Sequence, residues 1–243
     1  MIIFLTMIAA LAAGLIKAAF GIGAGVFLTP LLSIIMFPKT AVALMAPMML
    51  VTDITTLWVH WKKWELKYVR LLSPGFLLGV LAGSYYLAWA SPSLTKVTIG
   101  IIAIVFSAYQ IARIKYPKTF SSIDLNDTTG VILSIFAGAS SAIAHSGGII
   151  LTIYLITKKL SKSTFVATLV GILFLSDILK MFTYTKLGLL TPPILTSGLE
   201  LIPVLLIGSW LGSKLIKKLS DTQFVFYVNI LIFISGVLLT VKH

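Results

Sequence analysis

The chain has 243 residues, no cysteine and a formal net charge of +12, with 58% hydrophobic and only 11% charged residues. Soluble domains carry about 25% charged residues, so this composition excludes an ordinary soluble protein. The lack of cysteine excludes disulfides and cysteine-based metal or redox chemistry. Since the Lys and Arg residues lie almost entirely between apolar stretches, the positive charge is typical of membrane-protein loops and not of nucleic-acid binding.

Apolar segments follow one another along the whole chain. A membrane-spanning helix needs roughly 20 apolar residues. No intervening stretch is long and polar enough for a separate soluble domain. We therefore expect an all-α polytopic membrane protein in a lipid bilayer, with residues 1–243 forming a single transmembrane domain. The segments lie at about 2–37, 41–60, 71–91, 94–112, 129–157, 164–183, 194–216 and 222–241.

The first apolar segment contains a glycine-rich interruption, FGIGAG, from Phe20 to Gly25. Each glycine in a helix interior costs about 1 kcal/mol relative to alanine. The following piece, VFLTPLLSIIMF, is short for a full crossing. We expect a broken or re-entrant pair of half-helices, with Lys17 as a cation just before the break. Alternatively, the glycines allow close helix packing and Lys17 extends to the membrane surface.

Two aspartates, Asp53 and Asp177, lie 124 positions apart in the middle of apolar segments. A carboxylate at the bilayer centre costs about 2.5 kcal/mol or more. These carboxylates could carry protons, pair with Lys17, hold a cation or cap a helix. Lys180 follows Asp177 by three residues and could neutralise it. Since no basic residue follows Asp53 before His60, we favour Asp53 as the proton carrier.

The second half of the chain repeats the first. Residues 13–54 align with 137–178 at a shift of 124, and the match resumes at a shift of 129. Repeats of this kind are typical of secondary transporters, so we expect one repeat over 1–118 and another over 128–243. The Gly-x-x-x-Gly spacings favour helix packing inside the chain, with a homodimer as the alternative. The identical pairs are Ala13/Ala137, Gly14/Gly138, Ala18/Ala142, Gly23/Gly147, Leu31/Leu155, Thr40/Thr164, Val42/Val166, Ala43/Ala167, Asp53/Asp177, Ile54/Ile178, Pro74/Pro203, Gly79/Gly208 and Gly83/Gly212.

The second repeat carries its own break, AHSGG, from Ala144 to Gly148. An unwound turn frees backbone N–H groups, and the half-helix after it directs a positive N-terminus at the gap. Two such breaks favour a small anion, while Ser140 and Ser141 supply further polar groups. Alternatively, the serines bond to the preceding turn and His145 is a packing residue. The expected anion site comprises Lys17, Gly21, Gly23, Ala24, Gly25, His145, Ser146, Gly147 and Gly148; no catalytic residue, metal ligand or cofactor is expected.

The basic residues indicate how the segments cross. If every apolar segment crosses the membrane once, the Lys and Arg residues are divided almost evenly between its two sides. If each broken segment returns to its own side, thirteen Lys and Arg residues fall on one side and five on the other. We therefore expect inverted repeats, each a broken hairpin followed by three transmembrane helices, with both termini outside. The larger set is Lys62, Lys63, Lys67, Arg70, Arg113, Lys115, Lys118, Lys158, Lys159, Lys162, Lys214, Lys217 and Lys218; the smaller is Lys39, Lys96, Lys180, Lys186 and Lys242.

At these residues the chain resembles the TauE/SafE sulfite exporter family. The stretch GIGAGVFLTPLL, Gly21 to Leu32, is similar to the family's opening signature, and HSGGIILTIYLI stands where the family repeats it. His145 and Tyr154 depart from the first copy, where Gly21 and Pro30 stand, at the expected site. The resemblance covers essentially the whole chain. It implies transport of sulfur-containing anions, such as sulfite and sulfonates, across a bacterial or archaeal inner membrane.

The leading hypothesis is a secondary transporter for a small sulfur-containing anion, with Asp53 or Asp177 coupling transport to protons. A passive anion channel is the nearest alternative. An intramembrane lipid-diphosphate phosphatase would also use inverted re-entrant segments, but it needs clustered Glu, Ser, Arg and His to handle phosphate. Arg70 and Arg113 both lie at loops. The sequence therefore does not favour an enzyme.

Overall fold

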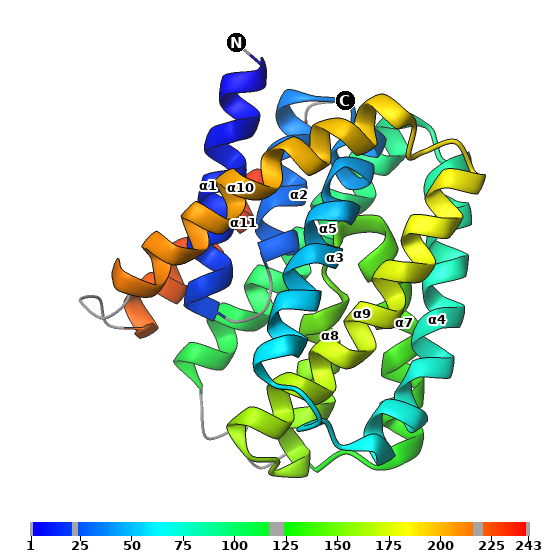
Figure 1. Cartoon of the computed structure of the whole chain (residues 1–243), viewed down its shortest axis with the longest axis vertical. Coiled ribbons are helices and arrows are strands. Elements are labelled where there is room, and N and C mark those ends of the chain that lie inside the picture. The colour runs from blue at the N-terminus through cyan, green and yellow to red at the C-terminus, as the bar shows by residue number, and fades with distance from the viewer. Residues whose placement is uncertain (1, 21–23, 117–123, 216–220, 242–243) are drawn as a thin grey trace.

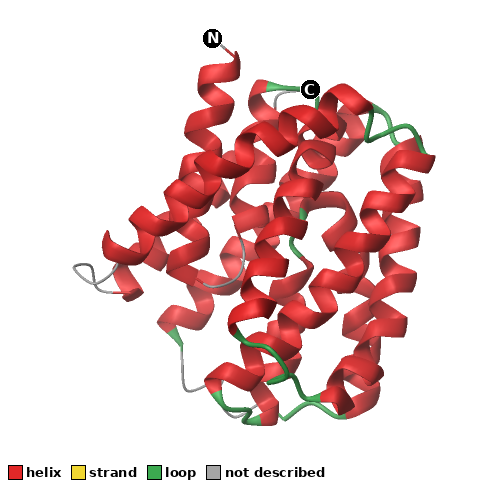
Figure 2. Ribbon diagram, viewed as in Figure 1, coloured by secondary structure: helices red, strands yellow, loops and turns green. Residues whose placement is uncertain are grey.

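The computed structural model describes residues 2–20, 24–116, 124–215 and 221–241, and it is helical throughout these ranges apart from short connections (Figure 1, Figure 2). No strand occurs among the described residues. The predicted all-α class is thereby confirmed. Gly21 and Gly23 lie outside the described residues, as do the side chains of Lys17 and Ala24.

The helices of the first half recur in the same order in the second. The spacing follows the sequence repeat, because α9 begins 124 residues after α3, and α11 begins 129 residues after α5. A 3-10 turn, η1, extends α8. The first set is α1 (Ile2–Phe20), α2 (Ala24–Ile35), α3 (Pro38–Val59), α4 (Leu66–Trp89) and α5 (Pro92–Lys115). The second is α7 (Asp127–Ala144), α8 (Gly147–Leu155) with η1 (Ile156–Lys158), α9 (Lys162–Lys186), α10 (Pro192–Leu215) and α11 (Asp221–Val241).

Short polar residues fix where several helices begin. The side chains of Ser91, Asn126 and Ser161 each accept a hydrogen bond from the backbone N–H three residues later, at 3.1, 2.8 and 3.2 Å. These bonds satisfy N–H groups that have no partner within the helix. The helices α5, α7 and α9 therefore start at positions that the sequence itself specifies.

Six of the described helices are long and apolar enough to cross a membrane: α3, α4, α5, α7, α9 and α10. The protein is therefore a multi-pass membrane protein. By contrast, α2 has 12 residues and α8 has 9. At about 1.5 Å per residue these helices measure about 18 and about 14 Å, against a hydrocarbon core of about 30 Å. Neither half-helix can cross alone, in agreement with the short pieces predicted after each break.

Glycines bring helices of opposite halves into backbone contact. In the pair α4 and α7, a methyl group on Gly79 would overlap the carbonyl oxygen of Ile135. In the pair α10 and α1, a methyl group on Gly208 would overlap the carbonyl oxygen of Leu11. These two contacts are equivalent under the sequence repeat. The Gly-x-x-x-Gly motifs therefore serve helix packing within the chain, as the sequence favoured.

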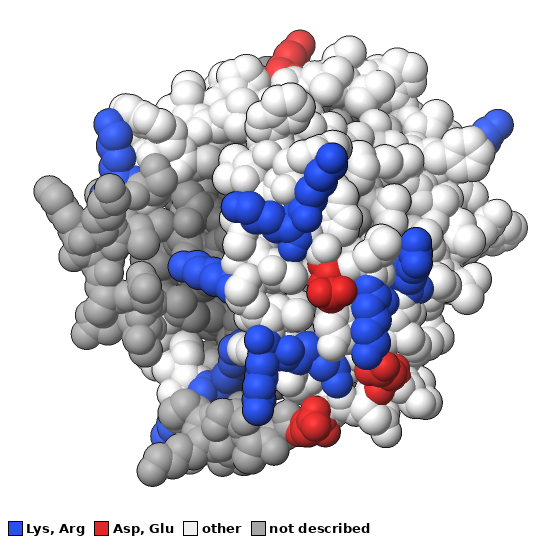
Figure 3. Space-filling view, turned by 60° about the horizontal axis from the view of Figure 1, so that its bottom comes forward, with Lys and Arg blue, Asp and Glu red and all other residues white. Residues whose placement is uncertain are grey.

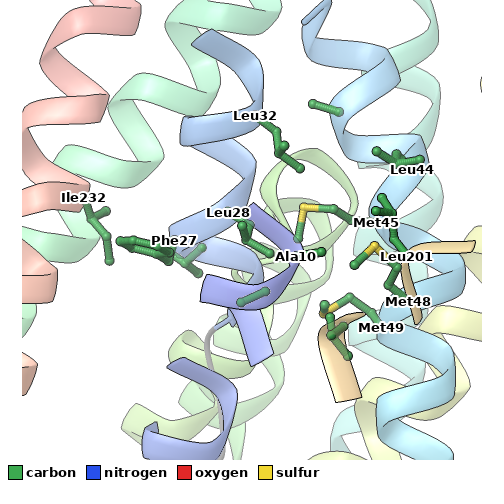
Figure 4. Packing of buried hydrophobic residues seen from close by; sticks show 14 of the residues in the cluster. Ala10, Phe27, Leu28, Leu32, Leu44, Met45, Met48, Met49, Leu201 and Ile232 are labelled. Carbon is green, nitrogen blue, oxygen red and sulfur yellow. The ribbon is translucent and has the colours of Figure 1, made fainter. Parts of the chain in front are cut away.

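The buried apolar residues form clusters between the helices. Figure 4 shows one of them, where Met45, Met48 and Met49 of α3 face Leu28 of α2 and Leu201 of α10. Methionine is unbranched and flexible, so it fills the irregular space beside a short half-helix. This cluster packs α2 between helices of both halves.

The close approach of α4 and α7 predicts the cost of a small substitution. A methyl group on Gly138 would overlap the carbonyl oxygen of Phe76, so Gly138→Ala should destabilise the protein by about 1–3 kcal/mol. Gly171→Ala is the matched control, because the nearest atom to the new methyl, Val69 Cγ2, lies 4.0 Å away. Thermal unfolding in detergent measures both variants. Equal midpoints for the two would contradict this packing.

Candidate functional site

The second break is a tight turn centred on His145. Helix α7 ends at Ala144, and His145 adopts the left-handed conformation with φ 49° and ψ 32°. Its N–H bonds to the carbonyl oxygen of Ser141 at 3.0 Å. A residue other than glycine is uncommon in this conformation, which usually costs about 1–2 kcal/mol. Figure 2 shows the break as a short loop midway between the two ends of the molecule.

Side chains from other helices satisfy the carbonyl groups that the break exposes. Thr29 Oγ1 of α2 donates to the carbonyl oxygen of Ala144 at 3.1 Å. The Tyr184 hydroxyl of α9 donates to the carbonyl oxygen of Ala142. An unpaired carbonyl inside a membrane costs several kcal/mol. These bonds therefore stabilise the break.

The two breaks meet. Gly25, at the start of α2, lies so close to His145 that a methyl group there would overlap His145 Cβ and stand 2.6 Å from its carbonyl oxygen. Only glycine fits at position 25. The structure therefore brings together Gly25 of the first predicted half-site and His145 of the second.

A buried lysine lies beside the second break. Lys180 of α9 is only 1% exposed, and its ammonium group has three partners from two helices and the break. Lys180 Nζ lies 2.6 Å from Asp177 Oδ1 and 3.2 Å from Ser141 Oγ. The third partner is His145 Nδ1, also at 3.2 Å. An ammonium group has three N–H donors, so these acceptors use all of them.

The neighbours of His145 fix its tautomer. An ammonium group only donates, so His145 Nδ1 accepts the bond from Lys180. A carbonyl oxygen only accepts, so Nε2 carries the proton and donates to the carbonyl oxygen of Val42 at 3.0 Å. The imidazole is therefore neutral and links α9 and the break to α3 of the other half.

The serines of the break bond to one another. Ser146 Oγ donates to the carbonyl oxygen of Ser140 at 3.1 Å, and the two hydroxyl groups are also hydrogen-bonded. Both residues are buried, as are Gly147 and Gly148. A methyl group on Gly147 would overlap the carbonyl oxygen of Ala137, so this glycine has the packing role considered from the sequence.

The structure changes the position expected for Tyr154. Sequence reasoning placed this residue at the site, but it lies at the far end of α8 from the break. Its hydroxyl donates to Asp127 Oδ1 at 2.6 Å, and its ring fills the space beside Gly130. Tyr154 therefore fastens α8 to the first turn of α7 and does not contact the break.

Asp53 and Asp177 are both buried, at 5% and 2% exposure. The predicted neutralisation of Asp177 by Lys180 is confirmed by the ion pair. The sequence analysis nevertheless left Lys180 out of the expected site and counted it among the five basic residues on one side of the membrane. The available signal was a lysine with apolar neighbours on both sides, three residues after a buried aspartate.

A family model matches residues 6–239 and carries the description Sulfite exporter TauE/SafE. The chain belongs to the TauE/SafE sulfite exporter family. Searches of curated proteins and of solved structures gave no match. Membership confirms the resemblance seen in the sequence and makes this TauE/SafE chain a membrane protein of an anion exporter family.

The bond from Thr29 to α7 predicts a measurable loss of stability. Thr29→Val keeps the size of the side chain but leaves the Ala144 carbonyl oxygen without this donor, which should cost about 1–3 kcal/mol. Thr185→Val is the control, because the exposed Thr185 hydroxyl bonds only within its own helix, to Met181. Thermal unfolding compares them. A loss no larger than that of the control would show that α2 does not support the break.

Proposed function

We propose that this TauE/SafE protein is a secondary transporter of a small sulfur-containing anion, such as sulfite, a sulfonate or a related organic anion. We place it in the inner membrane of a bacterium or archaeon. The observation that carries the proposal is the contact of Gly25 with His145, which joins the breaks of both halves beside the buried Lys180. The sulfite exporter family supports a sulfur-containing substrate.

The chemistry of the breaks supports an anion near the middle of the membrane. Helix α8 begins at Gly147, directly after the second break, so its positive N-terminal end lies at the site. Discontinuous helices in transporters use such ends to bind anionic groups. The proposed anion site combines Lys17, Gly21, Gly23, Ala24 and Gly25 of the first half with His145, Ser146, Gly147 and Gly148 of the second.

Helix directions support inverted repeats. Gly100 of α5 packs against Leu239 of α11, whereas Gly236 packs against Ala103 and Ile104, so these equivalent helices run antiparallel. Equivalent helices of opposite direction are what an inverted repeat requires. We propose that repeats 1–118 and 128–243 rock against each other and expose the site to each face in turn.

The distribution of charge supports one orientation. Figure 3 shows Lys and Arg side chains gathered on the face at the bottom of Figure 1. The loop before α4 meets the first turn of α9 at this end, where His60 Nδ1 lies 3.0 Å from Ser163 Oγ. Since positive loops face the cytoplasm, we propose that this face is cytoplasmic. Both termini would then be outside.

Charge balance supports coupling to a cation. Among the described residues, the buried Asp, Glu, Lys and Arg side chains are Asp53, Asp177 and Lys180, so the buried region holds no excess positive charge. An additional buried anion would leave the site negative, which is costly in a low-dielectric interior. We propose that a proton enters with the anion and that Asp53 or Asp177 carries it.

Flux in proteoliposomes tests this function. Sulfite or sulfonate uptake should saturate with concentration and should increase when a pH gradient drives protons in the same direction. Saturable flux that ignores the gradient would remove the coupling, and non-saturable flux would indicate a passive channel. Absence of flux for every sulfur-containing anion tried would rule out the proposed substrate class.

Two matched variants identify the proton carrier. Asp53→Asn or Asp177→Asn should abolish the response to the pH gradient at whichever position carries the proton, since the amide cannot bind and release one. Asp124→Asn is the control, because that side chain is 91% exposed. Gradient-driven uptake measures all of them. An unchanged response in both buried variants would exclude the two aspartates as carriers.

A further inference from the structure

We propose that Lys180 is the cation that binds the transported anion, with Asp177 as the counter-ion that occupies it when the site is empty. This inference rests on the proposed function and names the residue that recognises the negative charge. Neither the family match nor the sequence reading assigns such a role to Lys180.

The first support is the position of the ammonium group. Lys180 belongs to α9, yet its side chain reaches Ser141 in the last turn of α7 and His145 in the break. A lysine that served only to neutralise Asp177 needs no contact beyond its own helix. Instead, the charge is held where the half-helices α2 and α8 begin. An ionisable residue at such depth in a membrane protein is a functional candidate by default.

The second support is that an anion could replace some of the hydrogen-bond acceptors of Lys180. Two of the three acceptors, Ser141 Oγ and His145 Nδ1, are neutral groups at 3.2 Å. A sulfite or sulfonate oxygen is charged, and a charge-assisted hydrogen bond is roughly twice as strong as a neutral one. An incoming anion can therefore replace a neutral acceptor without leaving an N–H of Lys180 unpaired.

The third support comes from the sequence repeat. At the shift of 124, Lys17 aligns with Ser141, whose hydroxyl accepts a bond from Lys180, while Thr56 aligns with Lys180 itself. Positions 17 and 56 of the first half are therefore equivalent to positions 141 and 180 of the second. In each half one of the two positions is a lysine, but the lysine is at the first position in one half and at the second in the other. In the sequence, the halves do not share a lysine three residues after the aspartate. They share one lysine in a pair of positions that the second half places at its break.

The proposal sets Asp177 and the anion in competition for Lys180. Asp177→Asn removes the resident counter-ion, so it should strengthen anion binding. Lys180→Gln removes the cation, so it should weaken binding roughly tenfold to a hundredfold, the usual effect of losing hydrogen bonds to a charged group. A purely structural ion pair predicts no such opposite signs.

Folding must be separated from binding in this test. Lys180→Gln alone leaves the buried Asp177 carboxylate without its partner and can prevent folding. The double variant Asp177→Asn/Lys180→Gln removes both charges and avoids that penalty. Lys186→Gln is the matched control, because it changes the same charge at an exposed position on the same helix.

The experiment measures the sulfite concentration that half-maximally raises the midpoint of thermal unfolding of the purified protein in detergent. We expect the half-maximal concentration to fall in Asp177→Asn, to rise at least about tenfold in the double variant, and to stay unchanged in Lys186→Gln. If the folded double variant binds sulfite as tightly as the wild type, the proposed role of Lys180 is wrong, whereas the proposed function stands. If none of sulfite, sulfoacetate and taurine raises the unfolding midpoint of the wild-type protein, both the proposed function and this inference are wrong.

Discussion

An ammonium group buried between membrane helices needs a counter-charge and an acceptor for each of its N–H donors. Lys180 obtains both by joining Asp177 of its own helix to Ser141 and His145 of the second break. His145 accepts from Lys180 at Nδ1 and donates to the Val42 carbonyl oxygen through Nε2. This one network thus ties α9, the end of α7 and α3 into a single unit.

The halves share a packing scheme but differ in the side-chain bonds that hold their half-helices. Equivalent glycines, Gly79 and Gly208, set the same close contact between the halves twice. In the second half, Tyr154 bonds to Asp127 and fastens α8 to α7, whereas the aligned residue in α2 is Pro30, which has no side-chain donor. The two half-helices are therefore held by different side-chain bonds, α8 through Tyr154 and α2 through Thr29, which donates to the carbonyl oxygen of Ala144.

Local features could be predicted from the sequence, and long-range ones could not. The glycine clusters marked both breaks, and the spacing of Asp177 and Lys180 predicted their pairing, because each depends on neighbours within one turn or one loop. The bonds from Lys180 to Ser141 and from His145 to Val42 join residues 39 and 103 positions apart. They follow from the packing of whole helices. Tyr154 was misplaced for the same reason, since alignment with a motif does not give distance from the break.

A structure determined with selenite, the heavier congener of sulfite, tests the account most directly, because the anomalous signal of selenium locates the bound anion without ambiguity. The account predicts a peak beside the second break, near His145 and the start of α8, with an anion oxygen within hydrogen-bond distance of Lys180 Nζ. A peak elsewhere in the protein, or none at a concentration that saturates binding, would contradict it.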